Sequence, residues 1–142
     1  MDHFLINIED VTTQNEHFRK VLFTAPHSQL VLMSLKPGEE IGEETHDLDQ
    51  FIRVEVGRGT AQLNGKTFPV QDGSALVIPA GTRHNVINGS TDEPLKLYTI
   101  YSPPEHKDGK IHRTKADAEA DREDHFDGKT TAMLAGTATS EK

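Results

Sequence analysis

Short runs of alternating apolar and polar residues dominate the chain up to about residue 101. In the clearest run, residues 50–56, Ile52 and Val54 point to one face of an extended strand, and Arg53 and Glu55 point to the other. Other runs are rich in branched and aromatic residues, which favour strands. From these patterns we predict strands at residues 18–24, 29–35, 50–56, 60–63, 74–78 and 95–101.

Turn residues separate these strands at close intervals. The dipeptide Asn64-Gly65 between two β-forming runs is typical of a two-residue hairpin. Pro69 has no backbone N–H to donate, so the strand after that hairpin is expected at a sheet edge or at a bulge. Short strands separated by Gly, Pro and Asn predict an all-β sandwich or barrel rather than alternating strands and helices.

The N-terminal segment carries a small apolar cluster in a polar background. Phe4, Leu5, Ile6 and Ile8 have no obvious place in a barrel that later strands already supply. The cluster is expected either to add an edge strand to its own sheet or to form an arm that docks on a second copy, because soluble proteins cover unpaired edges. Symmetric exchange of this arm predicts a homodimer.

The composition changes after Pro103-Pro104. Thr114 can cap a helix over residues 115–126, where alanines and alternating charges favour a helix without an apolar stripe. From Asp127 onward the chain has little to pack and is expected to be disordered, and truncation after Thr114 is expected to leave a folded barrel. We therefore divide the chain into an N-terminal arm with the first strands (1–29), a barrel core (30–102) and a C-terminal tail (103–142).

Composition and charge narrow the range of functions. The 142 residues suit one domain, and the formal net charge of −8 argues against binding nucleic acid or an anionic membrane. The chain has no cysteine, so a metal site would use nitrogen and oxygen ligands. Residues 1–10 lack signal-peptide features, and no apolar run approaches the ~20 residues that cross a bilayer. We expect a cytoplasmic protein.

Four side chains combine the ligand types of a metal site. Glu44 and His46 stand two residues apart and therefore share one face of an extended strand. Gln50 follows a short turn, and His84 comes just after a Pro-Ala-Gly turn. Glu44 lies in a very acidic segment, so a solvated surface acid is the alternative reading of this residue. Two imidazoles, one carboxylate and one amide oxygen suit a divalent ion such as Zn, Fe, Mn or Ni.

Two motifs that contain these residues resemble the motifs of the cupin superfamily, over roughly residues 30–101. The first cupin motif, G-x5-H-x-H-x3-E-x6-G, is matched by Gly38, Glu44, His46, Gln50 and Gly57. The second, G-x5-P-x-G-x2-H-x3-N, is matched by Gly73, Pro79, Gly81, His84 and Asn88. The chain departs from the pattern at Glu44, where the motif has His, and at Gln50, where it has Glu. The resemblance implies a single-domain cupin barrel, a double-stranded β-helix of jelly-roll type, with Glu44, His46, Gln50 and His84 as metal ligands.

The resemblance leaves three functions open. In the first, a bound ion acts as a Lewis acid and Glu44 moves a proton in a non-redox enzyme, an isomerase or lyase acting on a sugar or related small oxygenated metabolite. Cupin-type phosphomannose isomerases have similar ligand types, Gln, His, Glu and His, in a different order. The second is an Fe(II)-dependent dioxygenase, because two His and one carboxylate are similar to a facial triad. The third is a cupin that binds a small molecule without catalysis.

Residues outside the motifs are interpreted mainly by their surroundings. Tyr98 and Tyr101 fall on opposite faces of one strand, so at most one of them lines the interior. Arg83 either lies on the surface or reaches the barrel mouth to meet an anion. Six histidines in polar or terminal segments are interpreted as surface residues: His3, His17, His27, His106, His112 and His125.

Overall fold

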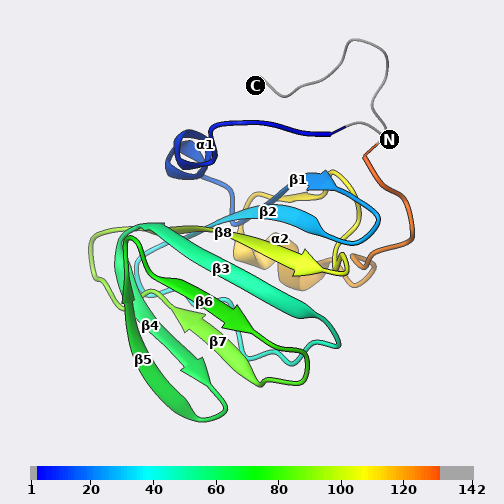
Figure 1. The fold of residues 1–142 in the computed structure, drawn as a ribbon. Helices are drawn as coiled ribbons and strands as arrows, with labels where there is room; N and C mark the ends of the chain where they lie inside the picture. The colour runs from blue at the N-terminus through cyan, green and yellow to red at the C-terminus, as the bar shows by residue number, and fades with distance from the viewer. Residues whose placement is uncertain (1–2, 132–142) are drawn as a thin grey trace.

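Two antiparallel sheets face each other across an apolar core (Figure 1). The structure, a computed structural model, describes residues 3–131. The larger sheet has the strand order β6-β3-β8-β2-β1-β9, and the smaller has the order β5-β4-β7. The strands are β1 Arg19–Thr24, β2 Gln29–Leu35, β3 Asp49–Val56, β4 Arg58–Leu63, β5 Lys66–Gln71, β6 Ala75–Ile78, β7 His84–Ile87, β8 Leu95–Ser102 and β9 Ile111–His112. The helices are α1 Ile8–Gln14 and α2 Lys115–Ala120.

The predicted all-β fold is confirmed, and local sequence rules account for its strands. The β4–β5 hairpin turns at Asn64 and Gly65, whose φ angles of 51° and 85° are the positive values that a two-residue hairpin requires. Pro69 lies on β5, at the edge of the smaller sheet, as its missing N–H predicted. Strands β7 and β9 and helix α1 are additions that the sequence patterns did not indicate.

The core forms where paired positions of neighbouring strands line up on the inner face of the larger sheet. Val54, Leu97 and Met33 are register partners across β3, β8 and β2, and each is at most 1% exposed. Burying one side chain of this size contributes about 1.5–3 kcal/mol to stability. The next register partner in this apolar row is a charged residue, Arg19 of β1.

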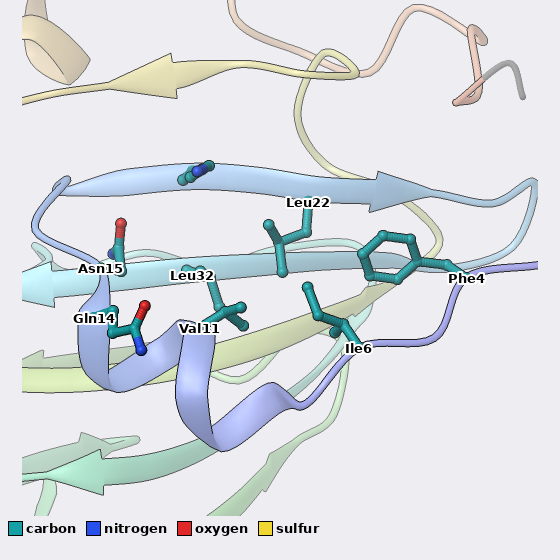
Figure 2. A pocket seen from close by; sticks show the side chains of 8 residues that line it. Phe4, Ile6, Val11, Gln14, Asn15, Leu22 and Leu32 are labelled. Carbon is teal, nitrogen blue, oxygen red and sulfur yellow. The ribbon is translucent and has the colours of Figure 1, made fainter. Parts of the chain in front are cut away.

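The N-terminal arm covers the outer face of the larger sheet in its own chain. It does so as an extended segment followed by α1, so the expectation of an added edge strand is wrong. The ring of Phe4 stacks on that of Phe23, with 5.0 Å between centroids. Figure 2 shows the resulting groove of about 420 Å³ between the arm, α1 and strands β1 and β2. It is lined by Phe4, Ile6, Val11, Gln14, Asn15, Lys20, Leu22 and Leu32.

The homodimer remains a prediction. If two chains exchange their arms, light scattering should find a dimer for the full chain and a monomer for a chain that starts at His17. The shortened chain loses the segment that stacks on Phe23 and lines the groove. Two monomers in this comparison would rule out the dimer, and two dimers would place its interface elsewhere.

The C-terminal tail packs against the barrel as far as the structure describes it. Thr114 caps α2 by accepting a hydrogen bond from the backbone N–H of Asp117, as predicted, but the helix ends at Ala120 instead of running to residue 126. The helix ends where Asp121 bonds His112 on β9 and Asp124 bonds His106, which follows β8. Thr131 donates its N–H to the carbonyl of Thr24 on β1, so the end of the described chain is also bonded to the barrel. The rest of the segment expected to be disordered, residues 132–142, lies outside the described residues.

Neither helix in the described part of the chain has the length and apolar character needed to cross a membrane.

Candidate metal centre

The long loop before β3 runs alongside β7 and carries the first two predicted ligands. Glu44 and His84 exchange both backbone hydrogen bonds, each 2.9 Å long. Two residues later, the carbonyl of His46 accepts the N–H of Gly81 at 2.9 Å. These bonds hold the backbone at residues 44–46 extended against β7. The side chains of Glu44 and His46, two residues apart, therefore point to the same side.

Three of the four predicted residues converge. Ligand atoms of Glu44, His46 and His84 all lie within 4.8 Å of one another. The Oε1 atom of Glu44 lies 3.1 Å from Nε2 of His46, and the ring centroids of His46 and His84 are 5.2 Å apart. One carboxylate and two imidazoles at this separation can hold a divalent ion.

His84 is fixed in the orientation expected of a ligand. Its side chain is buried, and Nδ1–H donates to the carbonyl of Thr82 at 2.8 Å. This bond leaves the lone pair on Nε2, which is buried and has no hydrogen-bond partner. Metal-bound histidines are commonly held in this way, with the second ring nitrogen bonded to a carbonyl.

Gln50 offers a second unpaired acceptor on the same side of the barrel. It lies on β3 directly opposite Tyr101 of β8, whose ring is 6.0 Å from that of His46. The amide nitrogen of Gln50 donates to the hydroxyl of Thr99 at 3.0 Å, which leaves the buried Oε1 atom without a partner. Buried polar atoms are rarely left unpaired, so these acceptors suit a bound cation. The donor set as a whole therefore fits a divalent ion.

Glu44 and His46 form an electrostatic pair within this set. Burial opposes ionisation of Glu44, but the hydrogen bond and charge of His46, together with Arg19 and His84, outweigh it and lower the pKa of the carboxyl. The same hydrogen bond to Glu44 raises the pKa of His46 against the effect of burial. The Glu44 side chain is also 37% exposed, compared with 12% for His46. Glu44 is thus an ionised carboxylate that solvent and small molecules can reach.

The segment after β8 adds residues that the sequence reasoning missed. Oε2 of Glu105 lies 3.6 Å from Nδ1 of His46, and burial raises the pKa of Glu105. The side-chain amide of Gln29 on β2 holds this segment by bonding the backbone of Glu105 and His106 at 2.8–3.1 Å. Of Tyr98 and Tyr101, of which at most one was expected to line the interior, Tyr101 does so. Nothing in the sequence around Glu105 distinguishes it from other acids of the tail.

Two histidines interpreted as surface residues are buried, so that interpretation is wrong for His106 and His112. Their side chains are 8% and 4% exposed. Asp124 accepts from Nδ1 of His106 at 2.7 Å, and Asp121 accepts from Nε2 of His112 at 3.0 Å. These carboxylates come from the tail, which brings them to the barrel only in the folded chain.

His112, Asp121 and Asp124 form a second cluster with ligand atoms within 4.8 Å. Its groups already have partners, because Lys110 Nζ lies 2.9 Å from Asp121 and Nδ1 of His112 accepts from Arg19 at 3.2 Å. We interpret this cluster as an ion-pair network that fastens the tail.

Comparisons with known proteins agree with the architecture. Residues 31–101 match the family described as Cupin domain. YrkC of Bacillus subtilis (strain 168), an uncharacterized protein, is 52% identical over 126 residues, which are 82% of this chain and 66% of YrkC. A second uncharacterized protein, from Acanthamoeba polyphaga mimivirus, is 49% identical over 113 residues, 76% of this chain and 70% of that protein. The crystal structure of BH2720 from Bacillus halodurans is 49% identical and superposes with a TM-score of 0.82, covering 84% of this chain and 96% of that one.

Proposed function

Because this chain belongs to the cupin domain family, we propose that it binds a divalent metal ion and catalyses a non-redox reaction of isomerase or lyase type on a small oxygenated metabolite, such as a sugar. The observation that carries the proposal is the pair of buried acceptors without partners, Nε2 of His84, which belongs to the Glu44–His46–His84 cluster, and Oε1 of Gln50. The match spans only 66% of the length of YrkC. Any activity that this chain would share with that longer protein is therefore also part of the proposal.

The proposed ligands are Glu44, His46, Gln50 and His84. An ion bound there would supply Lewis acidity, which polarises a carbonyl or hydroxyl oxygen of a substrate. Zn, Fe, Mn and Ni all accept this mixture of nitrogen and oxygen donors.

Glu44 is the residue proposed to move a proton. It is the most exposed of the three clustered side chains, and its lowered pKa keeps it ionised near neutral pH. An ionised carboxylate beside a polarised C–H or O–H group acts as a general base. His46 lies between two acids, with Nε2 at 3.1 Å from Glu44 and Nδ1 at 3.6 Å from Glu105.

A dioxygenase is the second candidate, because the three clustered residues are two histidines and one carboxylate. That composition is the facial triad of non-haem Fe(II) oxygenases. The amide oxygen of Gln50 argues for the non-redox reaction, since a fourth protein ligand would occupy a position that the triad leaves open.

Metal analysis followed by an oxygen measurement tests the proposal. Protein purified without added metal is analysed for its elements, then incubated with aldoses, ketoses and their acids under air and under argon. We expect the protein to contain zinc, manganese or nickel. The product should be an isomer of the substrate or a simple cleavage product of it, and the same amount should form under air and under argon. Iron together with oxygen consumption would favour the dioxygenase. A protein without metal or turnover would support a binding function alone.

The substitution Gln50→Glu is expected to keep the metal and to tighten its binding about tenfold, or ~1.4 kcal/mol. A second carboxylate strengthens attraction for the cation, but the ion becomes a weaker Lewis acid, so turnover should fall. In the absence of metal the variant should be less stable than the wild type, because residue 50 is 4% exposed and an unpaired buried carboxylate is costly.

Competition with a chelator measures this affinity, and thermal unfolding with and without metal measures the stability. Gln62→Glu, on an exposed position of β4, is the matched control for adding one acid. A loss of affinity in Gln50→Glu as large as that in His46→Ala would show that Gln50 does not coordinate the ion.

A further inference from the structure

Arg19 places a permanent positive charge inside the barrel. It is 7% exposed and its register partners are Met33 on β2 and His112 on β9. Met33 is part of the hydrophobic core, so the Arg19 side chain lies on the inner face of the larger sheet. Arginines are rarely buried to this degree unless a carboxylate or another anion pairs with them.

No carboxylate fills that role in the described residues. The ion pairs formed within residues 3–131 do not include Arg19. Its Nη1 donates to Nδ1 of His112 at 3.2 Å, and its Cζ lies 5.3 Å from the centre of the Phe18 ring. The Nε atom is buried and has no partner. A buried charge without a counter-charge costs several kcal/mol, so the fold retains a cation that a ligand would neutralise.

Burial and the contacts within the candidate metal centre have the larger effects on the pKa values of Glu44, His46 and Glu105, and the charge of Arg19 lowers all three in addition. The two carboxylates of this group are directed at His46 instead, Glu44 at 3.1 Å and Glu105 at 3.6 Å. Their side chains are 37% and 33% exposed, so solvent reaches both carboxylates. A small molecule bound at the Glu44–His46–His84 cluster would therefore lie within reach of the positive charge of Arg19.

We propose that Arg19 is the anchor for a carboxylate group of the substrate, so that the substrate is a small hydroxy or oxo acid rather than a neutral sugar. This inference rests on the proposed function of the same site. The planar guanidinium matches a carboxylate in two parallel hydrogen bonds. A phosphate dianion fits less well, because two acids, Glu44 and Glu105, already lie beside His46 and would repel its second negative charge.

Calorimetric titration with three probes of similar skeleton tests the anchor: glycerate, glycerol and glycerol 3-phosphate. The wild-type protein should bind glycerate at least about tenfold more tightly than glycerol, because a hydrogen bond between the Arg19 guanidinium and the carboxylate of glycerate contributes about that much affinity. Arg19→Gln should remove that preference. A purely structural role would lower the melting temperature and leave the ratio of the two affinities unchanged, which would overturn the proposal. Tighter binding of glycerol 3-phosphate than of glycerate would overturn the choice of carboxylate.

Two further variants keep the result interpretable. Arg19→Lys retains the positive charge and most of the aliphatic side chain, so it tests the anchor even if Arg19→Gln does not fold. Its affinity for glycerate should fall at least about threefold, because lysine lacks the planar guanidinium group. Unchanged affinity in Arg19→Lys would count against the anchor. Arg83→Gln removes the same charge from an exposed arginine paired with Glu43 at 2.6 Å and should keep the preference for glycerate. Loss of the preference in that variant would assign the anion to Arg83.

Metal content measured on the same samples separates this inference from the proposed function. An Arg19→Gln protein that keeps its metal and its preference for glycerate contradicts the anchor alone. A wild-type protein that lacks metal and turnover but prefers glycerate through Arg19 contradicts the proposed function alone.

Discussion

Replacing His46 or His84 with alanine is expected to abolish metal binding while the barrel stays folded. Loss of a residue that merely orients a ligand lowers metal affinity roughly 10–100-fold, so loss of a ligand should weaken it by at least about 100-fold. The fold should survive because residue 84 is tied to residue 44 through two backbone hydrogen bonds, which alanine preserves. The core is built mainly from Val, Leu and Ile side chains, which have no atoms that can coordinate an ion.

Elemental analysis gives the metal content, and circular dichroism gives the fold. His27→Ala is the matched control, because it removes one imidazole from an exposed turn. The control should keep a wild-type metal content. Unchanged metal in both His46→Ala and His84→Ala would end the assignment of this site.

Removing the tail is expected to have the second largest effect. Truncation after Thr114 should leave a folded barrel, but one with a melting temperature lower by roughly 10 °C. The described tail supplies Asp124, which accepts from Nδ1 of His106 at 2.7 Å and from the backbone N–H of Lys107 at 2.9 Å. Two hydrogen bonds to a buried charged acceptor are worth about 3 kcal/mol together, and each kcal/mol shifts the melting temperature of a chain of this size by about 3 °C.

Asp124→Asn tests the same contacts without removing the chain, and should account for a large part of the decrease. Asp127→Asn is its control, because Asp127 is exposed and bonds only the nearby N–H of Lys129 in the described structure. Scanning calorimetry of the truncated chain, Asp124→Asn and Asp127→Asn, each beside the full wild-type chain, gives their melting temperatures. A truncated chain that melts with the full chain would show that the tail contacts contribute nothing to stability.

The sequence carried enough information for the strands and their turns because those depend on neighbouring residues. Alternation with a period of two marked β3, and Asn64-Gly65 specified a hairpin by its backbone conformation. The same local reasoning brought Glu44 and His46 to one face, although their role as ligands is still a prediction. It failed for the helix after Thr114, where distant partners for two aspartates ended the helix early.

Arg19 shows why alternation alone does not locate every interior residue. Strict alternation would place apolar side chains on both faces of its strand, Phe18 and Leu22 on one and Val21 and Phe23 on the other, and a bulge between Val21 and Phe23 breaks that alternation. The sequence therefore gave no direction for the arginine. Pairing of β1 with β2 and β9 placed it beside Met33 and His112 on the inner face.

The sequence by itself determined the strands, the hairpin and the spacing of the candidate ligands, since each follows from backbone geometry over a few residues. Only the tertiary structure decided that Glu105 lies beside His46, that His106 and His112 are buried, and that Arg19 has no carboxylate partner within residues 3–131. These features join segments from opposite ends of the chain. A side chain's partner across such a distance depends on how the sheets and the tail pack, and no local pattern encodes it.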